Sequence, residues 1–164
     1  MEHHSIGSIS VSVILGRFDD SELDLVVKAQ DIPLGITPAG VISGGNTAGG
    51  FGITIKEASR ADNVIHWPAI SIENPNRRNA IYSATSDALS SADNLQATQI
   101  GFFTMGLEIS RLPSWEIAEE IVKAINDYSK NEPLLDKIML VASSPTQVSS
   151  FQYAITNISI ISQK

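Results

Sequence analysis

Three short apolar runs constrain the fold of this chain more than any other feature of its sequence. They are Leu23–Ala29, Ile100–Met105 and Lys137–Ala142. Each run is continuous rather than alternating, which is typical of strands covered on both faces of a sheet. Segments with helical periodicity separate the runs, so we expect parallel β-α-β crossovers. The predicted fold class is α/β, with three α/β/α layers: a mixed, mostly parallel central sheet with helices on both faces.

The other elements fit a single domain over residues 1–164, because no repeat, low-complexity tract or linker divides the chain. Alternating apolar and polar residues predict a strand at Ser8–Leu15, and Val64–Trp67 predicts another. Ser144 is expected to cap a helix with Pro145 at its first position and Gln147 reaching back. The remaining predictions are helices at Ile53–Arg60, Asn79–Asn94, Pro113–Ser129 and Ser144–Ala154, and a last strand at Asn157–Ser162.

Charge and composition exclude several classes of function. The formal net charge of -7 argues against broad electrostatic binding to nucleic acid or to an anionic membrane. No apolar run approaches the ~18 residues of a membrane span, and the first residues do not resemble a secretory signal. The chain has no cysteine, which excludes metal sites made of thiolates and catalysis by a thiolate nucleophile. We expect a cytoplasmic protein with no metal and no cofactor.

A glycine-rich segment follows the first of the apolar runs. Seven glycines fall within Ile32–Gly52, and Val41-Ile42 could form a short strand inside it. Ligands of open α/β sheets bind beyond the carboxyl ends of the strands, and this segment and Gly106 both follow predicted strands. Gly49, Gly50 and Phe51 come before a predicted helix, so their N–H groups could face an anion. The alternative is a surface lid without a ligand.

Three stretches, in order and at matching separations, resemble the macro domain family. Gly16–Asp31 takes the place of the family's Gly-Asp-Ile-Thr turn and of the strand that ends in Asn-Ala-Ala-Asn. Gly49–Ala58 is similar to the family's Gly-Gly-Val-Ala-x-Ala-Ile loop and helix. Ala80–Ile125 matches the helix, strand, turn and Pro-x-x-x-Ile-Ala helix of the family's second half. The resemblance covers nearly the whole chain and implies an ADP-ribose-binding fold.

The positions that bind ADP-ribose in that family are partly replaced. Arg17 stands where the family has the Asp that contacts the adenine amine, and Lys28 and Asp31 replace the two Asn of Asn-Ala-Ala-Asn. The second phosphate loop reads Glu108–Arg111 where the family has glycines, and we expect Glu108 to repel a diphosphate. The resemblance assigns ligand binding to Arg17, Phe18, Asp31, Gly49, Gly50, Phe51, Gly106, Leu107, Glu108, Ile109 and Ser110, and catalysis to no residue.

Several polar residues have a structural interpretation that we prefer to a functional one. His66 is expected to pack in a strand, and Asp19-Asp20 to shape a turn. The remaining candidates are likewise given no functional role: His3-His4 in a floppy terminus, Arg77-Arg78 at a solvated helix start, Glu119-Glu120 on a solvated helix face, and Ser143-Ser144 at a helix cap.

Three hypotheses about function follow. The chain is a divergent macro-like domain that binds ADP-ribose or a related nucleotide or other phosphate-bearing small molecule, with the usual contacts partly lost. Alternatively, it is a non-catalytic scaffold or protein-interaction domain that has lost nucleotide binding. A weak ADP-ribosyl hydrolase is the third. The sequence favours binding over catalysis and leaves the oligomeric state and the ligand open.

Overall fold

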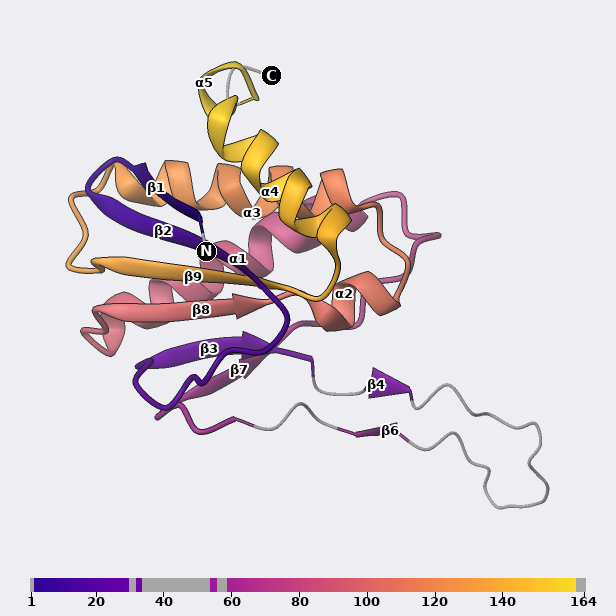
Figure 1. Cartoon of the computed structure of the whole chain (residues 1–164), viewed down its shortest axis with the longest axis horizontal. Coiled ribbons are helices and arrows are strands. Elements are labelled where there is room, and N and C mark those ends of the chain that lie inside the picture. The colour runs from indigo at the N-terminus through magenta and orange to yellow at the C-terminus, as the bar shows by residue number, and fades with distance from the viewer. Residues whose placement is uncertain (1, 30–31, 34–53, 56–58, 162–164) are drawn as a thin grey trace.

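A computed structural model of the chain describes residues 2–29, 32–33, 54–55 and 59–161. Its main sheet has strand order β1-β2-β9-β8-β3-β7 (Figure 1). Every neighbouring pair in that sheet is parallel except β1 with β2. The strands are β1 (Glu2–Ile6), β2 (Ile9–Leu15), β3 (Leu25–Lys28), β7 (Val64–His66), β8 (Gln99–Phe103) and β9 (Lys137–Ala142). The predicted mixed, mostly parallel sheet is confirmed, with all three apolar runs at its centre.

Two short strands, β4 (Ile32–Pro33) and β6 (Thr54–Ile55), pair with each other in a separate antiparallel ladder. The helix predicted over Ile53–Arg60 is therefore wrong where it can be checked, because Thr54–Ile55 is strand and Ser59 and Arg60 are not helical. The strand considered at Val41-Ile42 lies outside the described residues.

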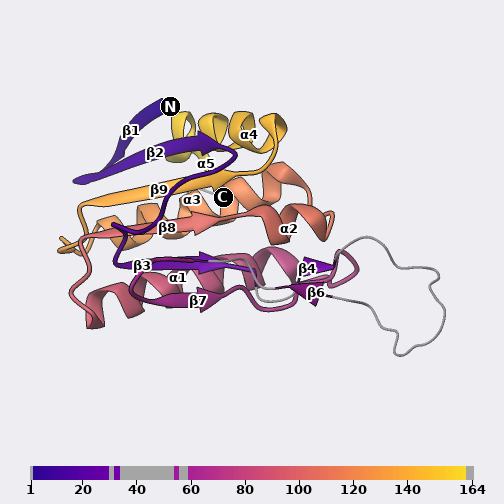
Figure 2. The same ribbon diagram turned by 60° about the horizontal axis from the view of Figure 1, so that its bottom comes forward.

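The longer helices cover one face of the sheet (Figure 2). Their apolar side chains form one core with every second residue of the central strands, such as Leu25, Phe102 and Leu140. The opposite face has a smaller cluster around Val26 and Phe103, which the turns beside the sheet cover with Phe18 and Ala61. The helices are α1 (Arg77–Asn94), α2 (Met105–Ile109), α3 (Ser114–Ser129), α4 (Pro145–Thr156) and α5 (Ile158–Ile161). In the described residues the layers are thus helix, sheet and turn, and the helices predicted for the second face are not seen among them.

Both ends of the described chain differ from the prediction. The segment expected as a last strand is helix α5, where Ile161 is buried, because packing against α3 outweighs the strand preference of its isoleucines. His3 and His4 lie in β1 instead of a floppy terminus, and His3 Nδ1 is 2.8 Å from Ser12 Oγ. Pairing with β2 fixes this segment.

The segment after β8 is also more regular than expected. The predicted strand ends at Phe103, and Met105 begins the helix α2, so residues 106–110 are not an open turn. Ser144 caps α4 as predicted and accepts a hydrogen bond from the Gln147 N–H at 3.2 Å. The Gln147 side chain does not reach back, since it donates to the Ser114 carbonyl at 3.1 Å.

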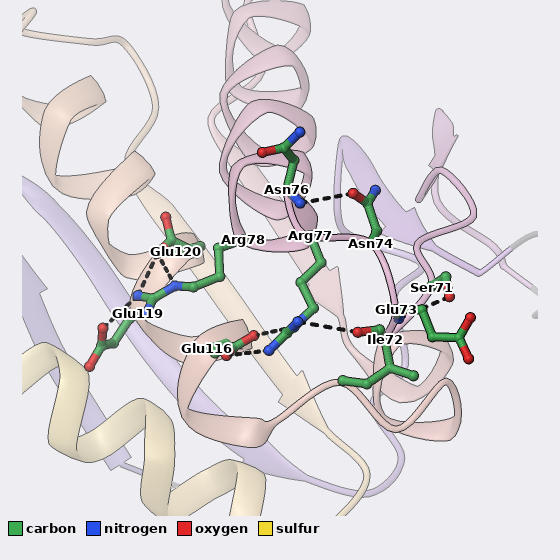
Figure 3. Close-up of polar contacts among 10 residues, drawn as sticks. All are labelled: Ser71, Ile72, Glu73, Asn74, Asn76, Arg77, Arg78, Glu116, Glu119 and Glu120. Carbon is green, nitrogen blue, oxygen red and sulfur yellow. Dashed lines mark hydrogen bonds and ion pairs between the residues drawn. The ribbon is translucent and has the colours of Figure 1, made fainter.

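Helices α1 and α3 are joined by a cluster of ion pairs that we call the helix clamp: Arg77, Arg78, Glu116, Glu119 and Glu120 (Figure 3). Arg77 donates to both oxygens of Glu116, at 2.8 and 2.9 Å. Arg78 pairs with Glu119 at 2.7 Å and with Glu120 at 2.6 Å. Glu116 and Glu120 are each only 5% exposed. The prediction of a solvated helix face is wrong for Glu119 and Glu120, whose side chains are 14% and 6% exposed, whereas the Arg77 and Arg78 side chains stay partly exposed at 27% and 36%.

Of the helices in the described segments, none is long and apolar enough to cross a membrane.

Candidate functional site

A cavity opens at the carboxyl ends of the central parallel strands. Gly16 follows β2, Lys28 ends β3, Phe103 ends β8 and Ala142 ends β9, and all four line it. Its volume is about 990 Å³. The full lining is Gly16, Arg17, Phe18, Asp19, Asp20, Lys28, Ser59, Arg60, Phe103, Met105, Val141, Ala142 and Ser143. Parallel strands bring their carboxyl ends to one edge, so the topology places a ligand-sized space here.

The turn after β2 forms one wall of the cavity. Gly16 has φ of +93°, which side chains rarely adopt, and its N–H donates to the Ala142 carbonyl at 2.8 Å. The chain is thereby turned across the end of β9. Arg17 follows on the exposed side, and Phe18 is half-buried against the smaller apolar cluster. The turn therefore presents a cation and an aromatic ring to the same space.

The base of the cavity holds a buried ion pair, the floor pair of Lys28 and Asp20. Lys28 Nζ lies 2.9 Å from Asp20 Oδ2, and the two side chains are 7% and 6% exposed. The same ammonium lies 4.3 Å from the centre of the Phe103 ring. Asp20 also accepts hydrogen bonds from Ser59 Oγ at 2.7 Å and from the Arg60 N–H at 2.9 Å. This one carboxylate thus joins the turn after β2, the end of β3 and residues 59–60.

These contacts keep Asp20 ionised. Burial raises its pKa, but the hydrogen bonds from Ser59, the Arg60 backbone and Lys28, with the charge of Lys28, outweigh burial and leave the pKa lowered. A carboxylate with a lowered pKa is a weak base. The contact between Asp20 and the Ser59 hydroxyl therefore favours a structural bond over activation of a nucleophile.

Glu108 is held by contacts within the protein. Its carboxylate accepts hydrogen bonds from Thr104 Oγ1 at 2.7 Å, from the Ser143 N–H at 2.9 Å and from Ser144 Oγ at 2.7 Å. It joins α2 to the start of α4, and it does not line the cavity. These three donors give the carboxylate an internal contact, and its effect on a bound diphosphate stays a prediction.

The other residues predicted for the second phosphate loop lie elsewhere. Gly106, Leu107 and Ser110 line a separate cavity of about 420 Å³ beside Trp67 and Ala29. A Cβ on Gly106 would lie 2.4 Å from the Ala29 Cβ, so this glycine permits the close approach of α2 to the end of β3. Ile109 is 43% exposed and lines neither cavity.

The sequence prediction and the observed cavity thus overlap in part. Arg17 and Phe18 line it, whereas Asp31, Gly49, Gly50 and Phe51 lie outside the described residues, as does the proposed cleft between Gly49–Phe51 and residues 106–110. The residues that the prediction missed include Asp20, Ser59, Arg60 and Met105, together with Lys28, which was noted only as a replacement. The sequence did carry one signal for the floor pair. Lys28 is a charged residue in an otherwise apolar strand, and a buried charge needs a partner. Ser59 and Arg60 carried no comparable signal.

Among residues 2–29, 32–33, 54–55 and 59–161, no three or more His, Asp or Glu side chains form a group that could hold a metal ion.

No family model and no curated protein matches this sequence. Solved structures do match its fold. A macrodomain of Oceanobacillus iheyensis with ADP has a TM-score of 0.68 and 14% identity, and the match covers 97% of this chain and 96% of that one. A Trypanosoma brucei macrodomain in complex with ADP-ribose has a TM-score of 0.57 and 13% identity, covering 87% of this chain and 68% of that one. The chain has the macrodomain fold, with a sequence that has diverged far from these structures.

Proposed function

We propose that the cavity binds a nucleotide-like, phosphate-bearing small molecule whose base differs from, or is bound differently than, the adenine of ADP-ribose. The observation that supports this most is the lining itself, which places Arg17, Arg60 and Lys28 around one space of about 990 Å³. Guanidinium and ammonium groups are the side chains that bind phosphate. A volume of this size is at the upper end of the range for ligand sites, roughly 300–1,000 Å³.

The fold adds independent support. The similar macrodomain structures from O. iheyensis and T. brucei contain ADP or ADP-ribose. In this chain Phe18 offers a ring for a base to stack on, and Arg17 offers donors at the same wall. The cavity lining carries three basic residues, Arg17, Lys28 and Arg60, beside two acidic ones, Asp19 and Asp20.

Arg17 argues against ordinary ADP-ribose as the preferred ligand. Resemblance to the family places a carboxylate at this position to accept a hydrogen bond from the adenine amine, and a guanidinium has donors only. The loss of one charge-assisted hydrogen bond costs roughly 1.5–3 kcal/mol, or about 10- to 150-fold in affinity. A base that offers acceptors, or an additional phosphate, would suit Arg17 better.

Calorimetry tests the proposal with ADP-ribose, ADP, ATP, GDP and UDP on the wild type and on Arg17→Asp. We expect ADP-ribose to bind the wild type weakly and Arg17→Asp about 10- to 150-fold more tightly. Lys137→Asp is the matched control, because it reverses the same charge at the exposed start of β9, the opposite edge of the sheet. Its affinities should equal those of the wild type.

The outcomes separate two questions. If the folded wild type binds no nucleotide of the panel, nucleotide binding is refuted. Low-micromolar binding of ADP-ribose by the wild type would show that Arg17 does not control recognition of the base.

A scaffold without a nucleotide ligand remains the second candidate, and the Glu108 contacts favour it. The carboxylate takes the Ser143 N–H and the Ser144 hydroxyl, two donors beside the cavity that an anion could otherwise use. The same titrations decide between the candidates.

A further inference from the structure

Lys28 occupies an unusual place for a charged side chain. It is the last residue of β3, where Leu25, Val26 and Val27 before it are all buried. It is itself only 5% exposed, and it lines the cavity. A buried ion pair is weak evidence for stability, because well-packed apolar residues in its place are often as stable or more so. The position of Lys28 in the cavity wall suggests a role beyond holding the strand.

The chemistry of the floor pair permits an exchange of partners. A lysine ammonium is a compact charge on a flexible stem, so it can be redirected by a small change of rotamer. Asp20 would keep the Ser59 Oγ and Arg60 N–H bonds if Lys28 turned away from it. The Phe103 ring, whose centre lies 4.3 Å from the ammonium, also lines the cavity. An incoming anion could thus take Lys28 without leaving Asp20 unsolvated and unbonded.

We propose that Lys28 binds the phosphate of the ligand at the base of the cavity, and that Asp20 competes with that phosphate for the ammonium. This inference rests on the proposed function and specifies its ligand: the anionic group contacts the buried Lys28, while the base lies near Phe18 and Arg17 at the exposed turn. Lys28 is then a specificity-determining residue that selects phosphorylated over unphosphorylated forms.

Two substitutions are expected to change the affinity for pyrophosphate in opposite directions. In Lys28→Met, pyrophosphate and phosphorylated nucleotides should bind about 10-fold more weakly or worse, because a charge-assisted bond is lost. In Asp20→Asn, the competing charge is removed and the shape is kept, so pyrophosphate should bind several-fold more tightly than to the wild type. A role confined to structure would not predict tighter binding in either variant.

The experiment is a titration of the whole chain with inorganic pyrophosphate, with the tightest nucleotide of the panel and with the nucleoside of that nucleotide. Thermal unfolding of each ligand-free variant checks that it is folded. The nucleoside is the matched control, since a cavity deformed by Lys28→Met would also weaken it, whereas loss of phosphate recognition alone would not. Lys137→Met removes a lysine at the opposite edge of the sheet and should change nothing.

The results distinguish this inference from the proposal on which it rests. Nucleotide binding by the wild type that is unchanged in Lys28→Met and in Asp20→Asn would overturn the role of Lys28 and leave the proposed function standing. If no probe binds the folded wild type, both are overturned. Should Lys28→Met fail to fold, Asp20→Asn decides alone: tighter pyrophosphate binding supports the inference, and unchanged or weaker binding overturns it.

Discussion

The helix clamp and the floor pair use the same chemistry in two different places. In each, a carboxylate that is about 5% exposed is held by a cation from another element. Arginines of α1 hold Glu116 and Glu120 of α3, and Lys28 of β3 holds Asp20 of the turn after β2. The clamp uses arginine, and Arg77 fixes both oxygens of Glu116 in a planar fork. The floor pair uses lysine, and it lines a cavity of ligand size. Arginine suits a fixed joint and lysine suits a contact that can be exchanged, so we infer a structural role for the clamp and a binding role for the floor pair.

Among the substitutions that test this comparison, we expect Glu116→Ala to change the free energy of unfolding most. Removing one partner of a buried ion pair costs roughly 3–5 kcal/mol when the other charge stays buried. The Arg77 side chain is 27% exposed and can be hydrated, so we expect Glu116→Ala to lower the free energy of unfolding by about 2–3 kcal/mol. Urea denaturation measures it, with the exposed Glu73→Ala as control. Nucleotide affinity of the folded protein should not change, and a large change would contradict the division of roles.

Replacement of Arg77 by lysine tests whether the two parallel hydrogen bonds to Glu116 stabilise the protein. Arg77→Lys keeps the charge and loses one of the two bonds to Glu116, so about 1 kcal/mol of stability should be lost. The corresponding change at the floor pair, Lys28→Arg, keeps its charge and should retain phosphate binding. Equal stability of Arg77→Lys and the wild type would show that charge alone holds the clamp.

The dependence of stability on pH gives a smaller expected effect. Burial raises the pKa of Asp20 and so partly offsets the lowering by its hydrogen bonds. The pKa of Asp20 is lowered in the folded state, so its contribution to stability is complete above the unfolded value near 3.8. That contribution is lost as the pH falls through the lower folded pKa. Asp20→Asn should therefore flatten the decline in stability below pH 3.8, as measured by urea midpoints across that range. A decline as steep as that of the wild type would assign acid sensitivity to other carboxylates.

Replacement of Lys123, which lies beside the clamp, should change the free energy of unfolding least. Its ammonium is 3.4 Å from Glu120, three residues earlier on the same helix, and Arg78 already pairs with that carboxylate. Lys123→Met should lower the free energy of unfolding by about 0.2–0.5 kcal/mol at most. A loss above about 1 kcal/mol would place Lys123 within the clamp.

Much of the fold could be predicted from the sequence because the relevant signals are local. The apolar runs at the sheet centre, the periodicity of α1 and α3 and the Ser144 cap each depend on residues close together in the chain. The prediction for the end of the chain was wrong because it too used only local signals. The isoleucines of α5 favour a strand locally, whereas their packing against α3 makes the segment a helix. The edge of the sheet at which a cavity forms also follows from parallel strands.

The sequence by itself determined the strands β2, β3, β7, β8 and β9, the helices α1, α3 and α4, and the place of Arg17 and Phe18 in a turn at the carboxyl edge of the sheet. Only the tertiary structure decided which charges meet. Arg77 and Glu116 are 39 residues apart, as are Asp20 and Ser59, and no periodic pattern connects either pair. Periodicity gives the face of an element on which a side chain lies, whereas its partner depends on which element packs against that face. The partners of Lys28 and Glu108, and with them the chemistry of the cavity, were therefore fixed only when the strands and helices came together.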